Sequence, residues 1–196
     1  MRSSAGSARR TRRQAGGRKP KRVLVRPRRT RPVCSRSAPV LVIGVGNLAR
    51  ADDGVGVLAA RKLKAAGLRG TEIVEASGES AGLMELWRGA ESVILVDAIQ
   101  SGARPGTIRR LDARNERVPA GLFHCSTHAL GVAEAVELSR LLGQLPPHLV
   151  IYGVEGRRFG VGRRPTPVVA ASVAEVARRV QREIESMPPR IRARAK

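Results

Sequence analysis

Two carboxylates and one imidazole stand where enzymes of the α/β class carry their chemistry. Asp53 follows the turn Gly44-Val-Gly46-Asn47, Asp97 ends the aliphatic run 92–96, and His128 follows a Ser-Thr pair that can begin a helix. Open α/β sheets place such residues just beyond the carboxyl ends of strands or at the following helix starts, so one crevice can gather all three. Because this ligand set suits nickel, zinc or manganese and leaves coordination positions open, we expect Asp53, Asp97 and His128 to form a metal site.

Each of these side chains also has a simpler structural role. Asp52 or Asp53 can cap the following helix, because aspartate is a preferred N-terminal cap and complements the helix dipole. His128, taken alone, is more often structural than a ligand. Asp97 is harder to explain in this way, since a carboxylate directly after five core-type strand residues costs free energy unless it finds a partner.

The apolar pattern predicts the elements that would position these residues. Aliphatic or short apolar runs predict strands at 40–43, 72–75, 92–96 and 149–152, and alternation predicts an edge strand at 106–111. Helical periodicity predicts helices from Asp53 to about Ala66, Ser80 to about Arg88, Ser126 or Thr127 to about Leu142, and Val168 to about Ile184. This alternation predicts an α/β three-layer sandwich, in which a twisted, mostly parallel five-stranded sheet has helices on both faces.

The positive charge of the chain is concentrated at its beginning. Of the formal net charge of +21, residues 1–38 contribute 14 Lys and Arg with no Asp or Glu. We therefore predict a basic, disordered extension at 1–38, a folded domain at 39–186 and a basic tail at 187–196. The extension is interpreted as an upstream extension from a misassigned start, with an organelle transit peptide or a nucleic-acid-binding arm as alternatives.

Composition argues against several classes of protein. With two cysteines and no Cys-x-x-Cys pair, neither a disulfide framework nor a thiolate zinc site is expected, and a cytoplasmic setting fits. No apolar run reaches the length of a membrane span. Only 2% of residues are aromatic, so a base-stacking surface is nearly absent, and nucleic acid would bind only nonspecifically through the N-terminal segment.

Two other functions remain open at this point. Glycines at Gly44 and Gly46 after a first strand are compatible with a Rossmann-like nucleotide-binding protein, in which the backbone approaches a diphosphate. The fingerprint is incomplete, because Ala49 stands where its third glycine belongs and two aspartates in the same turn would repel phosphate. The second alternative is a nucleic-acid-binding module that acts through the arginine-rich N-terminal segment.

A longer stretch resembles the opening signature of a known enzyme family. The segment Gly44-Val-Gly46-Asn47-Leu-Ala-Arg-Ala-Asp52-Asp53-Gly54-Val-Gly56 resembles the Gly-x-Gly-Asn, four residues, Asp-Asp/Glu-Gly-x-Gly signature of the hydrogenase maturation endopeptidases. The stretches 96–99 and 126–131 resemble the second and third family segments, in the same order and at similar separations. The resemblance covers about residues 40–186.

The resemblance implies a function for the three candidate ligands. Asp53, Asp97 and His128 match the family's three metal-binding positions, and we expect them to be the catalytic residues of a metal-dependent, aspartic-type endopeptidase. The implied reaction removes the C-terminal extension of a nickel-loaded [NiFe]-hydrogenase large-subunit precursor. Nickel would arrive bound to this precursor, which is the expected protein partner. The chain is expected to act on it as a monomer, and no membrane is expected to take part.

The chain departs from the family pattern at two places. Relatives commonly carry an Asp-Gly-Gly-Thr-like segment after the second strand, whereas this chain has Glu75-Ala-Ser-Gly-Glu-Ser80. The usual proline after the Glu155 position is replaced by Gly156, and a strongly basic loop with Arg157, Arg158, Arg163 and Arg164 follows. One hypothesis is that this loop contacts an acidic patch or the carboxyl end of the precursor.

Overall fold

A computed structural model of the chain describes residues 40–123, 131–162 and 164–188. The elements in chain order are β1 (Val40–Val45), the 3₁₀ helix η1 (Ala51–Gly54), α1 (Val55–Ala65), β2 (Thr71–Ala76), α2 (Ser80–Leu86), β3 (Ser92–Ile99), β4 (Ile108–Asp112), α3 (Val132–Leu141), β5 (His148–Glu155) and α4 (Pro167–Ser186).

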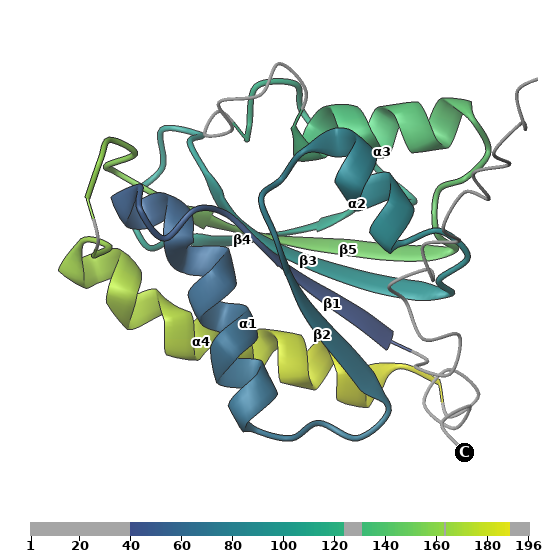
Figure 1. Cartoon of the computed structure of the whole chain (residues 1–196), viewed down its shortest axis with the longest axis horizontal. Helices are drawn as coiled ribbons and strands as arrows, with labels where there is room; N and C mark the ends of the chain where they lie inside the picture. The colour runs from purple at the N-terminus through teal and green to yellow at the C-terminus, as the bar shows by residue number, and fades with distance from the viewer. Residues whose placement is uncertain (1–39, 124–130, 163, 189–196) are drawn as a thin grey trace, which may run out of the picture. The chain divides into compact units, whose positions relative to one another are not determined.

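The strands form one sheet between two layers of helices. Their order is β2-β1-β3-β5-β4; neighbouring strands pair in parallel, except that β4 runs antiparallel to β5. Helices α1 and α4 cover one face of this sheet, and α2 and α3 cover the other (Figure 1). The predicted three-layer α/β fold with a mixed, mostly parallel five-stranded sheet is therefore confirmed.

Alternation along the central strands divides the core into two. In β3 the side chains of Val93, Leu95 and Ile99 pack toward α2 and α3, whereas Ile94, Val96 and Ala98 pack toward α1 and α4. Successive side chains of a strand point to opposite faces, so burial of both faces requires the continuous aliphatic run that the sequence shows. By the same parity Asp97 faces α2 and α3.

The strand order creates a crevice between β1 and β3. From β1 the chain continues to β2, which lies on one side of β1. The neighbour of β1 on the other side is β3, and β5 lies beyond it in the sheet. Ligands of open α/β sheets bind at such a switch point, outside the carboxyl ends of the strands. Asp53 follows β1 and Asp97 lies in β3, so the topology brings two of the three predicted ligands to this crevice.

Several element boundaries differ from the prediction. Strand β3 does not end before Asp97 but continues to Ile99, because residues 97–99 still pair with β5. Helix α2 ends at Leu86 rather than near Arg88. Helix α3 begins at Val132 rather than at Ser126 or Thr127, since Gly131 is extended and its N–H donates to the Glu134 carboxylate at 2.8 Å.

Of the predicted terminal segments, the structure describes only Met187 and Pro188, and Met187 is buried in the core on the α1 and α4 side. The stretch 124–130 that contains His128 lies outside the described residues. No helix among the described residues is long and apolar enough to cross a membrane.

Candidate active site

The glycine turn after β1 packs the polypeptide tightly against the sheet. Gly46 has a φ of +136°, and a Cβ added there would lie 1.8 Å from the carbonyl oxygen of Asp53. A Cβ on Gly56 would lie 2.2 Å from the carbonyl oxygens of both Val45 and Val96. These glycines therefore let η1 and the start of α1 sit directly on the ends of β1 and β3. The space that a diphosphate would need at Gly46 is filled by the chain itself, which argues against the nucleotide-binding alternative.

Asp97 is a buried carboxylate on an otherwise apolar strand. Its parity directs the side chain toward the α2 and α3 layer, where it is 6% exposed. Its Oδ1 accepts a hydrogen bond from the N–H of Ala98 at 2.7 Å. Burial raises the pKa of Asp97 well above its ordinary 3.8, the Ala98 hydrogen bond opposes this shift, and the nearby charge of Asp53 adds to it.

Asp53 lies in η1 on the cavity side of the glycine turn. Its Oδ2 accepts a hydrogen bond from the N–H of Asn47 at 3.0 Å. Burial raises the pKa of Asp53 above its ordinary value, although the charge of Arg50 and the Asn47 N–H act in the opposite direction. The capping role considered for this aspartate is wrong, because the N-cap residues of η1 and α1 are Arg50 and Gly54.

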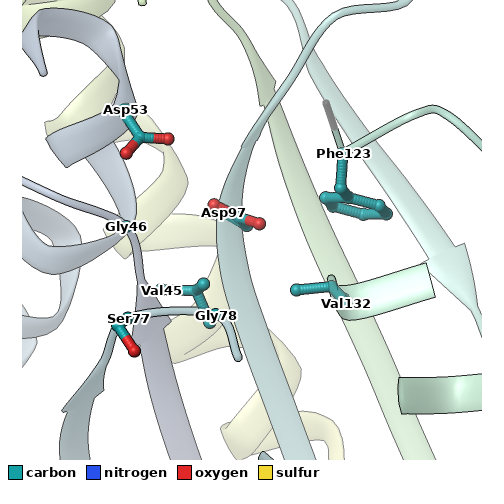
Figure 2. Close-up of a pocket in the computed structure, with 8 residues that line it drawn as sticks. All are labelled: Val45, Gly46, Asp53, Ser77, Gly78, Asp97, Phe123 and Val132. Atoms are coloured by element: carbon teal, nitrogen blue, oxygen red, sulfur yellow. The ribbon is translucent and has the colours of Figure 1, made fainter. Parts of the chain in front are cut away.

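The two carboxylates line one small cavity (Figure 2). Its volume of about 20 Å³ is enough for one water-sized ligand. The remaining lining residues are Val45, Gly46, Ser77, Gly78, Phe123 and Val132. In Figure 2 the Asp97 carboxylate lies between that of Asp53 and the Phe123 ring. Within the described part of the chain, Asn47 and Ala98 donate the only hydrogen bonds to these carboxylates, so one oxygen of each is left for a ligand.

Two apolar residues that line the cavity, Phe123 and Val132, were not predicted from the sequence. Phe123 is held near the end of β3 by the bond from the Gln100 N–H to the Leu122 carbonyl at 3.0 Å. Val132 is held by the Ser80 hydroxyl, which donates to the Gly131 carbonyl at 2.8 Å. Both are ordinary apolar residues without a sequence signal, except that they flank the segment with the candidate histidine.

His128 itself lies outside the described residues, and its role as a ligand stays a prediction. Across 40–123, 131–162 and 164–188, no three His, Cys, Asp or Glu side chains gather closely enough to hold a metal ion. The structure thus brings together Asp53 and Asp97 of the predicted set. Phe123 and Val132, on either side of the stretch 124–130, line the same cavity.

Asp52, next to Asp53, has a different environment. It is fully buried, and its Oδ2 accepts hydrogen bonds from the N–H groups of Arg157 and Arg158 at 2.9 Å each. The N–H and the hydroxyl of Thr166 also donate to this carboxylate. Burial alone would raise the pKa of Asp52, but the hydrogen bonds from the backbone outweigh it and lower the pKa below the ordinary value. Asp52 therefore fastens the loop after β5 and the start of α4 to η1.

Glu155 is a second buried carboxylate that the protein itself satisfies. It is 2% exposed and accepts hydrogen bonds from the N–H and the hydroxyl of Ser101 and from the N–H of Gly102. No sequence signal predicted either anchor, because their partners are 53 or more residues away in the chain.

Comparison with known proteins identifies the family to which this chain belongs. A family model described as hydrogenase maturation protease matches residues 57–183. The chain belongs to the hydrogenase maturation protease family. The matched range contains Asp97 and position 128, and it begins shortly after Asp53.

Individual members of the maturation protease family support this assignment. The chain is 34% identical over 134 residues to the hydrogenase 2 maturation protease of Escherichia coli, covering 65% of this chain and 80% of that protein. It is also 34% identical over 138 residues to the hydrogenase expression/formation protein HupD of Thiocapsa roseopersicina, covering 66% of this chain. The chain spans only 62% of the length of that HupD protein.

Solved structures of the family share the fold. The hydrogenase maturating endopeptidase HybD from E. coli superposes with a TM-score of 0.60 at 24% identity, covering 74% of this chain and 91% of that structure. The solution structure of an endopeptidase from Escherichia coli gives a TM-score of 0.60 at 28% identity, covering 72% and 88%. The three-layer arrangement described above is therefore that of the maturation proteases.

Proposed function

We propose that this chain is a hydrogenase maturation endopeptidase that removes the C-terminal extension of a nickel-loaded [NiFe]-hydrogenase large-subunit precursor. One observation of the structure supports the proposal in addition to family membership. Asp53 and Asp97, from segments 44 residues apart in the sequence, line one small cavity at the switch point of the sheet, and both have a raised pKa. Carboxylates that share a cavity and have a pKa perturbed by burial are typical of functional sites.

In this proposal the ligands to nickel are Asp53, Asp97 and His128. The donor set fits such an ion, because oxygen and nitrogen ligands suit borderline divalent metals. Each carboxylate also keeps one oxygen free of hydrogen bonds from the described residues. A cation between the two carboxylates would offset the burial that mainly raises the pKa of Asp97, and also the repulsion from Asp53 that adds to it.

Nickel belongs to the substrate in this proposal, and its binding would polarise the peptide group to be cleaved. A cation in the cavity would favour the ionised form of Asp97, because ligating carboxylates are ionised. A nickel-free precursor would leave the two carboxylates unbridged. Cleavage is therefore expected only after nickel has been inserted into the precursor.

The function is tested by incubating the purified full-length chain with nickel-loaded and with nickel-free precursor. Loss of the C-terminal extension is followed by mass spectrometry. The wild-type chain should cleave only the nickel-loaded precursor. Asp53→Ala, Asp97→Ala and His128→Ala should each slow cleavage at least about a hundredfold, because each removes a group that touches the metal.

His148→Ala is the matched control for His128→Ala. His148 is exposed and begins β5, at the end of the sheet opposite the cavity. Its replacement should leave the cleavage rate unchanged. Cleavage of nickel-free precursor at the wild-type rate, or full activity of the three alanine variants, would refute the proposal.

A further inference from the structure

The loop between β5 and α4 is rich in arginine and lies beside the turn that carries Asp53. We call residues 156–166 the arginine loop; its described residues include the exposed side chains of Arg157, Arg158 and Arg164. In Figure 1 this yellow-green segment runs from the end of β5 to the start of α4, past the N-terminal end of α1. Arg163 is outside the described residues.

The arginine loop is fixed to η1 by backbone and side-chain bonds. Asp52 accepts the N–H groups of Arg157 and Arg158 near the beginning of the loop and that of Thr166 at its end. Between these points, the Ala51 N–H donates to the Gly162 carbonyl at 2.8 Å, and the Gly162 N–H donates to the Ala49 carbonyl at 2.9 Å. A loop held at three places presents its side chains without a large ordering cost on binding.

The charges of the arginine loop are not neutralised by neighbouring carboxylates. Among the described residues, no ion pair involves Arg157, Arg158 or Arg164, whereas Glu175 pairs with three arginines of α4. The Asp52 carboxylate, to which the loop is bonded, already accepts four hydrogen bonds. Arg50 in the adjoining turn has a buried Nε without a hydrogen-bond partner in the described part of the chain. The surface around η1 is therefore locally positive.

We propose that the arginine loop binds acidic side chains in the C-terminal segment of the precursor, an inference that rests on the proposed function. Asp52 and Asp53 are adjacent in η1, one facing the loop and the other lining the cavity. A polypeptide with its scissile bond at the cavity needs to cross only η1 to reach the loop. Several arginines along one loop match several acidic side chains better than the single terminal carboxylate.

A polypeptide fits this surface better than a nucleic acid does. Phe159 is the only aromatic residue in the loop, and it is partly buried against the α1 and α4 core, where it cannot stack on a base. Val161 is fully exposed at the tip of the loop and offers an apolar contact beside the arginines. Charge complementarity at the rim of an interface mainly affects association and its dependence on salt.

The test compares Arg157→Glu/Arg158→Glu with Arg69→Glu/Arg114→Glu in the full-length chain. The control arginines are also exposed and form no ion pair among the described residues, but they lie at the end of the sheet away from the cavity, before β2 and after the antiparallel β4. Both double variants change the net charge by the same amount. Steady-state cleavage of nickel-loaded precursor gives kcat and KM, and titration with the same precursor gives its Kd.

The first variant should raise KM and Kd about tenfold or more and leave kcat within about twofold, because the loop contacts substrate away from the reacting bond. Added salt should weaken precursor binding to wild type and to the control, but much less to this variant. Neutralising the acidic side chains of the precursor's extension should reproduce the loss with wild-type protein, whereas amidating its terminal carboxylate should not.

Unchanged KM and Kd in the first variant, with cleavage by wild type intact, would overturn the docking proposal and leave the proposed function standing. Binding that depends on the two arginines without any cleavage would support the docking surface and count against the proposed function. Displacement of the precursor by a short RNA at equal concentration would assign the surface to nucleic acid and overturn the inference.

Discussion

The adjacent aspartates of η1, Asp52 and Asp53, lie in opposite environments on its two sides. On the loop side, Asp52 accepts hydrogen bonds from three backbone N–H groups and one hydroxyl, and its pKa is lowered. On the cavity side, Asp53 and Asp97 each accept one backbone hydrogen bond from the described residues, and the pKa of each is raised. Burial acts on all three in the same direction, so the number of donors decides the sign.

This contrast separates anchoring carboxylates from those that are available to a ligand. A carboxylate saturated by backbone donors stabilises the fold, and removing it leaves buried N–H groups without acceptors. A buried carboxylate with an unused oxygen destabilises the empty protein at neutral pH and is stabilised when a cation binds. The same residue type, at two adjacent positions of one turn, thus anchors a loop in one case and lines the cavity in the other.

The largest expected effect is the loss of the anchor. Asp52→Asn places an amide NH₂ where one oxygen accepts a backbone N–H, so it should lower the free energy of unfolding by about 3 kcal/mol. Urea denaturation of the full-length chain measures this change. Asp53→Asn is the matched control, because it makes the same substitution at the neighbouring position. A loss of stability at Asp53 as large as at Asp52 would contradict the distinction between the two sides.

A smaller effect of opposite sign is expected at the cavity. Asp97→Asn keeps an oxygen to accept the Ala98 N–H and removes a buried charge, so it should raise the free energy of unfolding by about 1–2 kcal/mol at neutral pH. The measurement is urea denaturation in the presence of a chelator. If Asp97→Asn instead lowers the free energy of unfolding, the Asp97 carboxylate has enough hydrogen-bond partners in the folded protein, which would contradict this prediction.

The dependence on pH follows from the direction of each pKa shift. Asp97 has a raised pKa in the folded protein, so its contribution favours folding below the ordinary pKa of 3.8 and declines as the pH rises through the raised value. Asp52 behaves in the reverse manner, since its stabilisation is present above 3.8 and is lost as the pH falls through its lowered pKa. Asp97→Asn should therefore reduce the decline at rising pH to the part that Asp53 contributes, and leave the loss in acid unchanged.

The smallest effect concerns another saturated carboxylate, far from the cavity. Glu183 on α4 accepts two hydrogen bonds from Arg110 and one from the Tyr152 hydroxyl. Burial, followed by this hydrogen bond and the charge of Glu183, raises the pKa of Tyr152 to about 12. Glu183→Gln should lower the Tyr152 pKa, because Arg110 then favours the phenolate, and should cost about 1 kcal/mol of stability.

Tyr152 is the only tyrosine of the chain, so the ultraviolet absorbance of its phenolate reports this titration directly. Asp112→Asn is a suitable control, since Asp112 lies on the same strand as Arg110 but its carboxylate accepts hydrogen bonds from Arg114 and Asn115. An unchanged midpoint in Glu183→Gln would show that the network does not control the tyrosine.

The sequence was most informative where a pattern repeats locally. Continuous aliphatic runs predicted the buried strands, alternation predicted the antiparallel edge strand β4, and the glycine-rich turn with its two aspartates led to the family. Element ends were less well predicted. Helix α3 was placed too early, because a Ser-Thr pair can cap a helix, whereas the extended Gly131 and Glu134 set its start at Val132.

The sequence by itself determined the fold class, the family and the candidate ligands, because hydrophobic periodicity and short motifs are properties of neighbouring residues. Only the tertiary structure decided which aspartate of the pair anchors a loop and which one lines the cavity. It also supplied the cavity's apolar wall from Phe123 and Val132. The donors to Asp52 come from residues more than 100 positions away, and no local pattern can indicate such partners before the chain has folded.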